Sequence, residues 1–102
     1  MEKVKIFISQ PMKGKSEAQI REEREKAIQQ AKSHIHGFEV EILDSFFADK
    51  FSPDYPPLYY LGQSVLVLSE ADFAYFAPGW EEARGCVIER MCCEMYGIPI
   101  LG

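Results

Sequence analysis

Apolar and polar positions recur with two different periods in the first half of the chain. A short β-branched run at 3–8 predicts a strand, which ends at the turn containing proline and glycine that follows it. Ser16 and Gln19 have the spacing of a capping box, and apolar residues then recur at helical spacing until Gly37, which predicts the first helix. Apolar and acidic residues alternate at 38–43, which indicates a strand with one wetter face, as at a sheet edge.

The second half holds longer apolar stretches separated by prolines and glycines. Three prolines and several aromatic residues at 44–57 indicate a long ordered loop. The apolar segment 58–69 fits a strand or a helix, but its length, with strand-like residues at 72–76 just beyond it, favours a buried helix. A third helix is predicted at 83–96 and a short last strand at 98–101.

These elements alternate in the order β-α-β-α-β-α-β, in a chain whose length suits one hydrophobic core. We therefore expect a single α/β domain over residues 1–102. The alternation predicts a small parallel sheet of about four strands, with right-handed crossovers and helices on both faces. Ligands bind such sheets at the carboxyl ends of the strands, which places the loop 9–14 beside 78–89.

Charge and hydropathy narrow the classes of partner. Sixteen acidic and eleven basic residues give a formal net charge of -5, so the surface would repel a phosphate backbone. The longest apolar runs fall far short of the ~20 residues of a bilayer span. The first residues also lack the pattern of a signal peptide. We expect a cytoplasmic protein that binds neither a nucleic-acid polymer nor a membrane.

Histidines and cysteines form no recognised metal pattern. His34 and His36 close a charged helix, where capping or solvation explains them. Cys86 and Cys93 lie seven residues apart and could share a helix face with two acidic residues, but neither the spacing nor the ligand set matches a zinc site. We expect reduced thiols, no metal and no cofactor.

The loop after the first strand offers groups that suit an anion. Between Ser9 and Lys15 it holds a hydroxyl, an amide, two lysines and backbone N–H groups ahead of a helix N-terminus. With a single glycine, Gly14, it is neither a P-loop nor a dinucleotide-binding loop. An ordinary strand-to-helix turn is the competing interpretation.

A stronger group of candidates lies at 78–89. Gly79 permits a sharp turn, Trp80 offers a stacking face, and Gly85 leaves room for a ligand. Glu89 lies early in the last predicted helix, where its carboxylate could face the cleft. The competing interpretation makes Glu89 and the nearby acidic residues solvated charges that favour the helix macrodipole.

Short motifs along nearly the whole chain resemble those of the nucleoside 2-deoxyribosyltransferase superfamily, and most closely its short members from bacteria and phages. The motifs are KIFISQPM at 5–12, Asp72, PGW at 78–80, GCVIE at 85–89 and GIPI at 97–100. The resemblance implies a flavodoxin-like, Rossmann-like three-layer sandwich. It also implies cleavage or transfer at the N-glycosidic bond of a nucleoside or nucleoside 5′-monophosphate.

The resemblance further implies roles for individual residues. Glu89 falls where the superfamily places a nucleophile that attacks the anomeric carbon and forms a glycosyl-enzyme ester, which water or a second base resolves with retention. The helix N-terminus would help to keep this carboxylate charged. The residues matched to substrate-binding positions are Ser9, Gln10, Pro11, Met12, Asp72, Gly79, Trp80 and Gly85.

Two positions depart from the pattern of the superfamily. Phe7 stands where these enzymes commonly have a tyrosine that hydrogen-bonds the nucleophile, and Ala83 stands where a polar side chain usually contacts the sugar. Glu82 and Tyr75 are candidates to compensate. The two departures keep a second hypothesis open, in which the protein is a non-catalytic module that binds or senses a nucleotide.

Aromatic residues crowd the segment 46–60, where core packing, a base-stacking lid and a subunit interface are competing interpretations. Members of the superfamily often complete their sites across subunits, so we expect a homo-oligomer, a dimer or larger. A third hypothesis for function is a small adaptor protein that uses this aromatic segment as its interface and binds no nucleotide.

Overall fold

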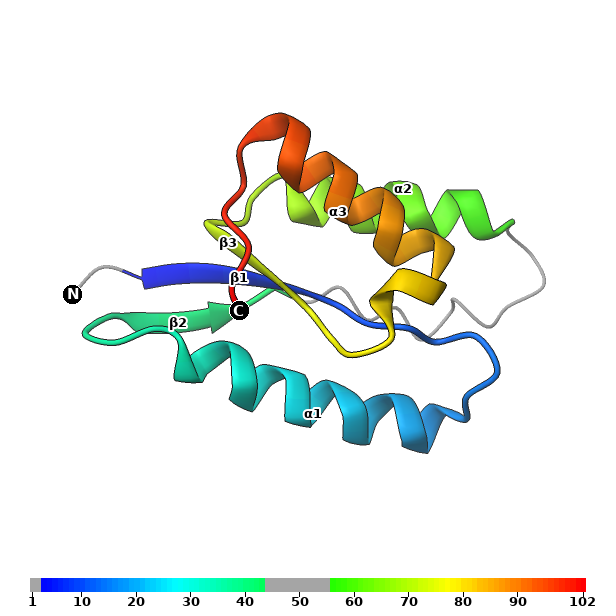
Figure 1. Ribbon diagram of the computed structural model, residues 1–102, viewed down its shortest axis with the longest axis horizontal. Coiled ribbons are helices and arrows are strands. Elements are labelled where there is room, and N and C mark those ends of the chain that lie inside the picture. The colour runs from blue at the N-terminus through cyan, green and yellow to red at the C-terminus, as the bar shows by residue number, and fades with distance from the viewer. Residues whose placement is uncertain (1–2, 44–55) are drawn as a thin grey trace.

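A parallel sheet organises the part of the chain that the structure describes. The computed structural model describes residues 3–43 and 56–102, and within them three strands pair in the order β2-β1-β3 (Figure 1). The expected α/β class is confirmed. The elements are β1 (Lys3–Ser9), α1 (Glu17–Ser33), β2 (Glu39–Ile42), α2 (Pro57–Leu68), β3 (Phe73–Phe76), the 3-10 helix η2 (Trp80–Glu82) and α3 (Arg84–Tyr96).

The central strand β1 separates two hydrophobic clusters. Successive side chains of a strand point to opposite faces of the sheet. Ile6 and Ile8 accordingly pack against alanines of α1, whereas Phe7 packs with residues of α2 and α3. Helix α1 therefore covers one face of the sheet, and α2 and α3 cover the other (Figure 1).

Helix α1 begins as expected but ends early. The capping box is present, with Ser16 Oγ accepting from the Gln19 backbone and the Gln19 side chain accepting from the Ser16 backbone. The helix ends at Ser33, before Gly37, whose φ of 83° belongs to the turn that leads into β2. Strand β2 lies at a sheet edge, as its alternation predicted.

Helix α2 forms where the long apolar segment predicted a helix, but it is not buried all round. Tyr60, Ser64 and Leu68, four residues apart, face the interior. Leu58 and Leu66 are 74% and 66% exposed. The expectation of a buried helix is wrong because only one face of α2 meets the sheet layer.

The predicted last strand at 98–101 is also wrong for the described residues, where three strands form the sheet rather than four. This segment makes only an isolated parallel bridge, between Ala74 and Ile100. The Ala74 N–H donates to Pro99 O, and the Ala74 carbonyl accepts from the Leu101 N–H. Pro99 has no N–H, and β3 is only four residues long, so the pairing does not extend into a strand.

The topology brings the carboxyl ends of β1 and β3 and the N-termini of α2 and α3 to the same end of the molecule (Figure 1). In the described ranges, no helix combines the length and apolar character that a bilayer crossing requires. Most of the loop predicted at 44–57 and of the aromatic segment at 46–60 lies outside the described residues, and Pro57, which we placed in the loop, is the first residue of α2.

Candidate functional site

A cleft opens at the end of the molecule where β1 ends and α3 begins. Its volume is about 1430 Å³, above the ~300–1,000 Å³ of common small-ligand sites. Its described lining comes from the end of β1 and the loop that follows, from one face of α2, and from the turn and first turns of α3. The cleft is therefore large enough for a nucleotide.

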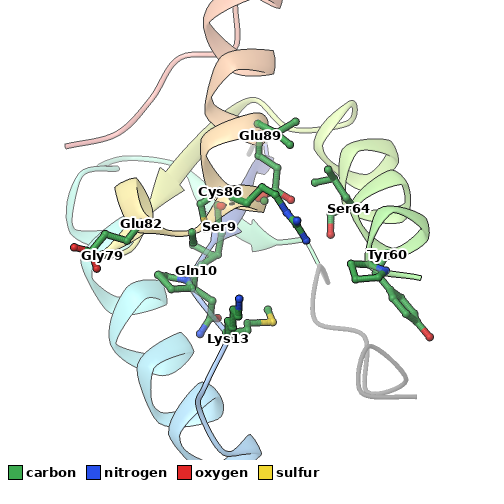
Figure 2. Close-up of a pocket in the computed structure, with 18 of the residues that line it drawn as sticks. Ser9, Gln10, Lys13, Tyr60, Ser64, Gly79, Glu82, Cys86 and Glu89 are labelled. Carbon is green, nitrogen blue, oxygen red and sulfur yellow. Dashed lines mark hydrogen bonds between the residues drawn. The ribbon is translucent and has the colours of Figure 1, made fainter. Parts of the chain in front are cut away.

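The buried polar side chains of the described residues lie in this cleft. Among residues 3–43 and 56–102, the buried polar or charged side chains are Ser9, Gln10, Ser64 and Glu89, and all four line this cleft (Figure 2). Burying such groups is costly unless they are paired, and they add little to a hydrophobic core. Their gathering in one cleft marks it as the candidate site.

Ser9 and Glu89 form the centre of the site. Ser9 Oγ donates to Glu89 Oε1 at 2.6 Å, and the two side chains are 2% and 7% exposed. This distance is typical of a hydroxyl that donates to a carboxyl oxygen. The hydrogen bond holds one oxygen of Glu89 in place at a buried position.

Local periodicity explains why these two residues meet. Phe7 and Ser9 share the face of β1 that looks toward α3, because side chains two apart on a strand point the same way. On α3, Cys86, Glu89 and Cys93 form the buried stripe that packs against this face. The interpretation of Glu89 as a solvated charge is therefore wrong.

The helix N-terminus contributes less to Glu89 than we expected. Glu89 is the sixth residue of α3, which begins at Arg84. The field of a helix terminus falls off within the first turn. Support for the carboxylate comes instead from the side chains packed around it, first of all from Ser9.

The start of α3 offers groups that suit an anion. Its N-cap, Ala83, has no capping side chain, and the first turn carries no acidic residue but begins with the exposed Arg84. Arg84, Gly85 and Lys13 all line the cleft. An uncapped helix N-terminus beside cations favours a negatively charged group.

The loop after β1 lies in the cleft as predicted. Pro11 and Met12 line it together with Gln10, and Gly79 lines it from the turn before α3. Lys15 also reaches the cleft, but its ammonium group is paired with Glu23 of α1.

Asp72 and Trp80 are not among the described residues that line the cleft. Asp72 precedes β3, and its Oδ2 accepts from the backbone N–H of Lys5 at 2.8 Å. Lys5 lies four residues before Ser9 on β1, so Asp72 sits about 13 Å from the cleft end of the strand. Its carboxylate holds the amino ends of β1 and β3 together.

Trp80 packs beside the site rather than in it. The Arg90 guanidinium carbon lies 4.3 Å from the centre of the Trp80 ring and 5.4 Å from that of Phe76. The two rings meet edge to face at 6.0 Å. Arg90 therefore covers one face of the Trp80 ring, a geometry typical of a cation–π contact.

The two candidates for compensating the lost polar groups differ in position. Glu82 is exposed and lines the rim of the cleft (Figure 2). Tyr75 packs on the opposite face of the sheet, with the cluster that faces α1. Only Glu82 can therefore replace the polar side chain that Ala83 lacks.

Sequence reasoning missed the contribution of α2. Tyr60 and Ser64 line the cleft from the buried face of this helix (Figure 2). A serine on the inward stripe of an otherwise apolar helix was the available signal, because hydroxyl groups are seldom buried without a polar partner nearby.

Cys93 is a buried thiol on the inward stripe of α3. Burial, with Cys92 and Glu89 as smaller contributions, raises the pKa of Cys93 to about 11, so this thiol is neutral at physiological pH. Within the described ranges, no three His, Cys, Asp or Glu side chains are grouped as a metal site would need.

Replacing Gly79 with alanine is expected to destabilise the protein by about 1–2 kcal/mol, because its φ of 89° is strained for other residues. The new Cβ would lie 3.5 Å from Pro11 Cγ, an ordinary contact, so the cost comes from the backbone conformation. Gly62→Ala is the matched control. Gly62 lies inside α2 with open space around it, so alanine should stabilise by about 0.5–1 kcal/mol. Urea unfolding measures both, and equal effects would contradict the assignment of Gly79.

The cleft thus combines a buried carboxylate–hydroxyl pair, a buried amide and an uncapped helix start with nearby cations. Such a set can bind a polar ligand and present a nucleophilic oxygen to it. Comparisons with protein-family models, curated proteins and solved structures gave no match to this chain.

Proposed function

We propose that this protein binds a nucleoside 5′-monophosphate in the cleft and cleaves or transfers at its N-glycosidic bond, with Glu89 as nucleophile. The observation that carries the proposal is the buried Glu89 carboxylate, held in a cleft by the Ser9 hydroxyl. The resemblance of the motifs to nucleoside 2-deoxyribosyltransferases supports it. So does the parallel sheet with helices on both faces, which is compatible with the Rossmann-like sandwich that the resemblance implies.

The proposed reaction has two steps. A Glu89 carboxylate oxygen attacks the anomeric carbon while the bond to the base nitrogen breaks, and the bonding electrons leave with the base, which takes up a proton from water. In the second step, water, which gives up a proton to solvent, or a nitrogen of another base attacks the anomeric carbon from the side opposite the ester, and the bond from this carbon to the Glu89 oxygen breaks and restores the carboxylate. Two inversions give net retention at the anomeric carbon.

Ser9 supplies the hydroxyl that Phe7 lacks. The resemblance predicts a tyrosine at position 7 that bonds the nucleophile, and Ser9 lies two residues along the same face of β1 with its Oγ on Glu89. We assign Ser9 the positioning role of that tyrosine. The absence of a hydroxyl at position 7 is then no argument against catalysis.

A phosphate group fits the start of α3. The N-terminus of α3, which has no side-chain cap, and Arg84 favour an anion, and Gly85 carries no side chain to block its approach. This favours a monophosphate over an unphosphorylated nucleoside. Glu82 and Glu89 also line the cleft, so the support for a phosphate comes from Arg84 and Lys13 and not from the charge of the surface as a whole.

The test is chromatographic detection of free base after incubation with a panel of nucleosides and 5′-monophosphates. We expect release from at least one monophosphate. Arg84→Met should raise KM for it about tenfold, the usual scale of one charged hydrogen bond, without changing KM for the nucleoside. Lys32→Met removes the same charge on an exposed part of α1 and should change neither.

The alternative is a module that binds a nucleotide without cleaving it, which the apolar Ala83 at the cleft favours. No base release, with a monophosphate still raising the melting temperature, would support this alternative. If the protein neither releases base nor binds a nucleotide, both hypotheses are contradicted. The expectations of a homo-oligomer and of a cytoplasmic location stay predictions, as does the adaptor hypothesis.

A further inference from the structure

Gln10 has a buried amide whose two ends meet different surroundings. The side chain is 5% exposed, and its Nε2 donates to the backbone carbonyl of Ile20 at 3.0 Å. A carbonyl oxygen only accepts hydrogen bonds, so the amino end of the amide must face Ile20 and the orientation is fixed. Oε1 is buried and has no hydrogen-bond donor among residues 3–43 and 56–102.

An unpartnered acceptor at this place is informative because Gln10 lines the cleft beside Ser9 and Glu89 (Figure 2). Buried polar atoms are almost always paired in folded proteins, and an unpaired one is costly. The anchored Nε2 prevents the amide from turning to relieve the cost. A ligand that brings a donor would do so.

We propose that Gln10 Oε1 accepts a hydrogen bond from an uncharged donor of the ligand and so makes Gln10 a specificity-determining residue. A phosphate is mostly a dianion at neutral pH and offers only acceptors, so Gln10 does not hold it. A nucleotide carries three kinds of suitable donor: the sugar hydroxyls, the exocyclic amine of adenine, guanine or cytosine, and the ring N–H of guanine or uracil. The inference rests on the proposed function for the identity of the ligand.

A sugar hydroxyl is the expected donor. Gln10 directly follows Ser9, whose hydroxyl holds the proposed nucleophile, and neighbouring Cα atoms are only ~3.8 Å apart. Although Gln10 is anchored to α1 and Ser9 is bonded to α3, both residues line the same cleft, so we expect the donor that meets Gln10 to belong to the sugar. On this basis the protein should distinguish ribonucleotides from a deoxy form.

The experiment measures dissociation constants, or KM where turnover occurs, for the four common ribonucleoside 5′-monophosphates and their 2′-deoxy and 3′-deoxy forms. Purine riboside 5′-monophosphate, which lacks the amine of adenosine, tests the base. In the wild type, removing the bonded donor should weaken binding about tenfold. In Gln10→Met this difference should disappear. Gln29→Met, on the exposed side of α1, is the matched control and should keep it.

The outcomes separate this inference from the proposed function. Weaker binding of a deoxy form by the wild type but not by Gln10→Met supports a sugar donor. The same pattern with purine riboside 5′-monophosphate supports a base donor. Binding that is indifferent to every change in the wild type would overturn the inference, even if base is released. If the wild type binds an analogue more weakly, Gln10→Met removes this difference, and no base is released, the inference about Gln10 stands and catalysis is contradicted. If Gln10→Met does not fold, Gln10→Lys keeps a donor for the Ile20 carbonyl and removes the acceptor, so it should lose the discrimination in the same way.

Discussion

Glu89→Gln is expected to lower base release by at least about a thousandfold, the scale on which enzymes lose activity with their nucleophile. The amide has nearly the shape of the carboxylate, and its oxygen can still accept from Ser9 Oγ at the observed position. What it lacks is the negative oxygen that attacks the anomeric carbon. Initial rates of base release measure the effect, and circular dichroism should show an unchanged fold.

The control is Glu94→Gln, which makes the same replacement at an exposed position of α3. It should leave the rate unchanged. A Glu89→Gln variant that keeps more than about a tenth of the activity would contradict the assignment, because a loss of that size reflects one hydrogen bond rather than a nucleophile.

Much of the fold follows from local patterns that act over a few residues. The alternation of β1 determines which side chains meet α1 and which meet α3. The capping box at Ser16 and the left-handed Gly97, with a φ of 76°, place the start of α1 and the end of α3. In each case, neighbouring residues alone satisfy the backbone groups of the helix end.

The errors arose where a side chain depends on distant partners. Periodicity identified α2 as helical, but its burial depends on how far the sheet layer extends, so Leu58 and Leu66 came out exposed. Ser9 and Glu89 are 80 residues apart in the chain, and no spacing rule reports that they bond. The position of Asp72 was predictable, because a residue that precedes a strand lies at the amino end, away from the expected site.

Ser9→Ala should cause the largest loss of stability among the site variants, about 1.5–3 kcal/mol, the usual value of a hydrogen bond to a charged group. Both partners are buried, so water cannot readily replace the lost donor. The same change should lower base release by about ten- to a hundredfold, because the carboxylate is no longer held in one orientation. Urea unfolding and initial rates measure the two effects, and Ser33→Ala, at the exposed end of α1, should change neither the rate nor the cleft.

Phe7→Tyr tests whether the loss of rate in Ser9→Ala comes from the missing hydroxyl or from changed packing. If Ser9 fills the role of the missing tyrosine, Phe7→Tyr alone should give no gain in rate, because Glu89 already has its hydroxyl donor. In the Ser9→Ala background, the same change should restore part of the rate by offering a hydroxyl from the same face of β1. A gain from Phe7→Tyr in the presence of Ser9 would show that the serine hydroxyl does not do this work. Recovery only in its absence would show that one hydroxyl on this face is what the carboxylate requires.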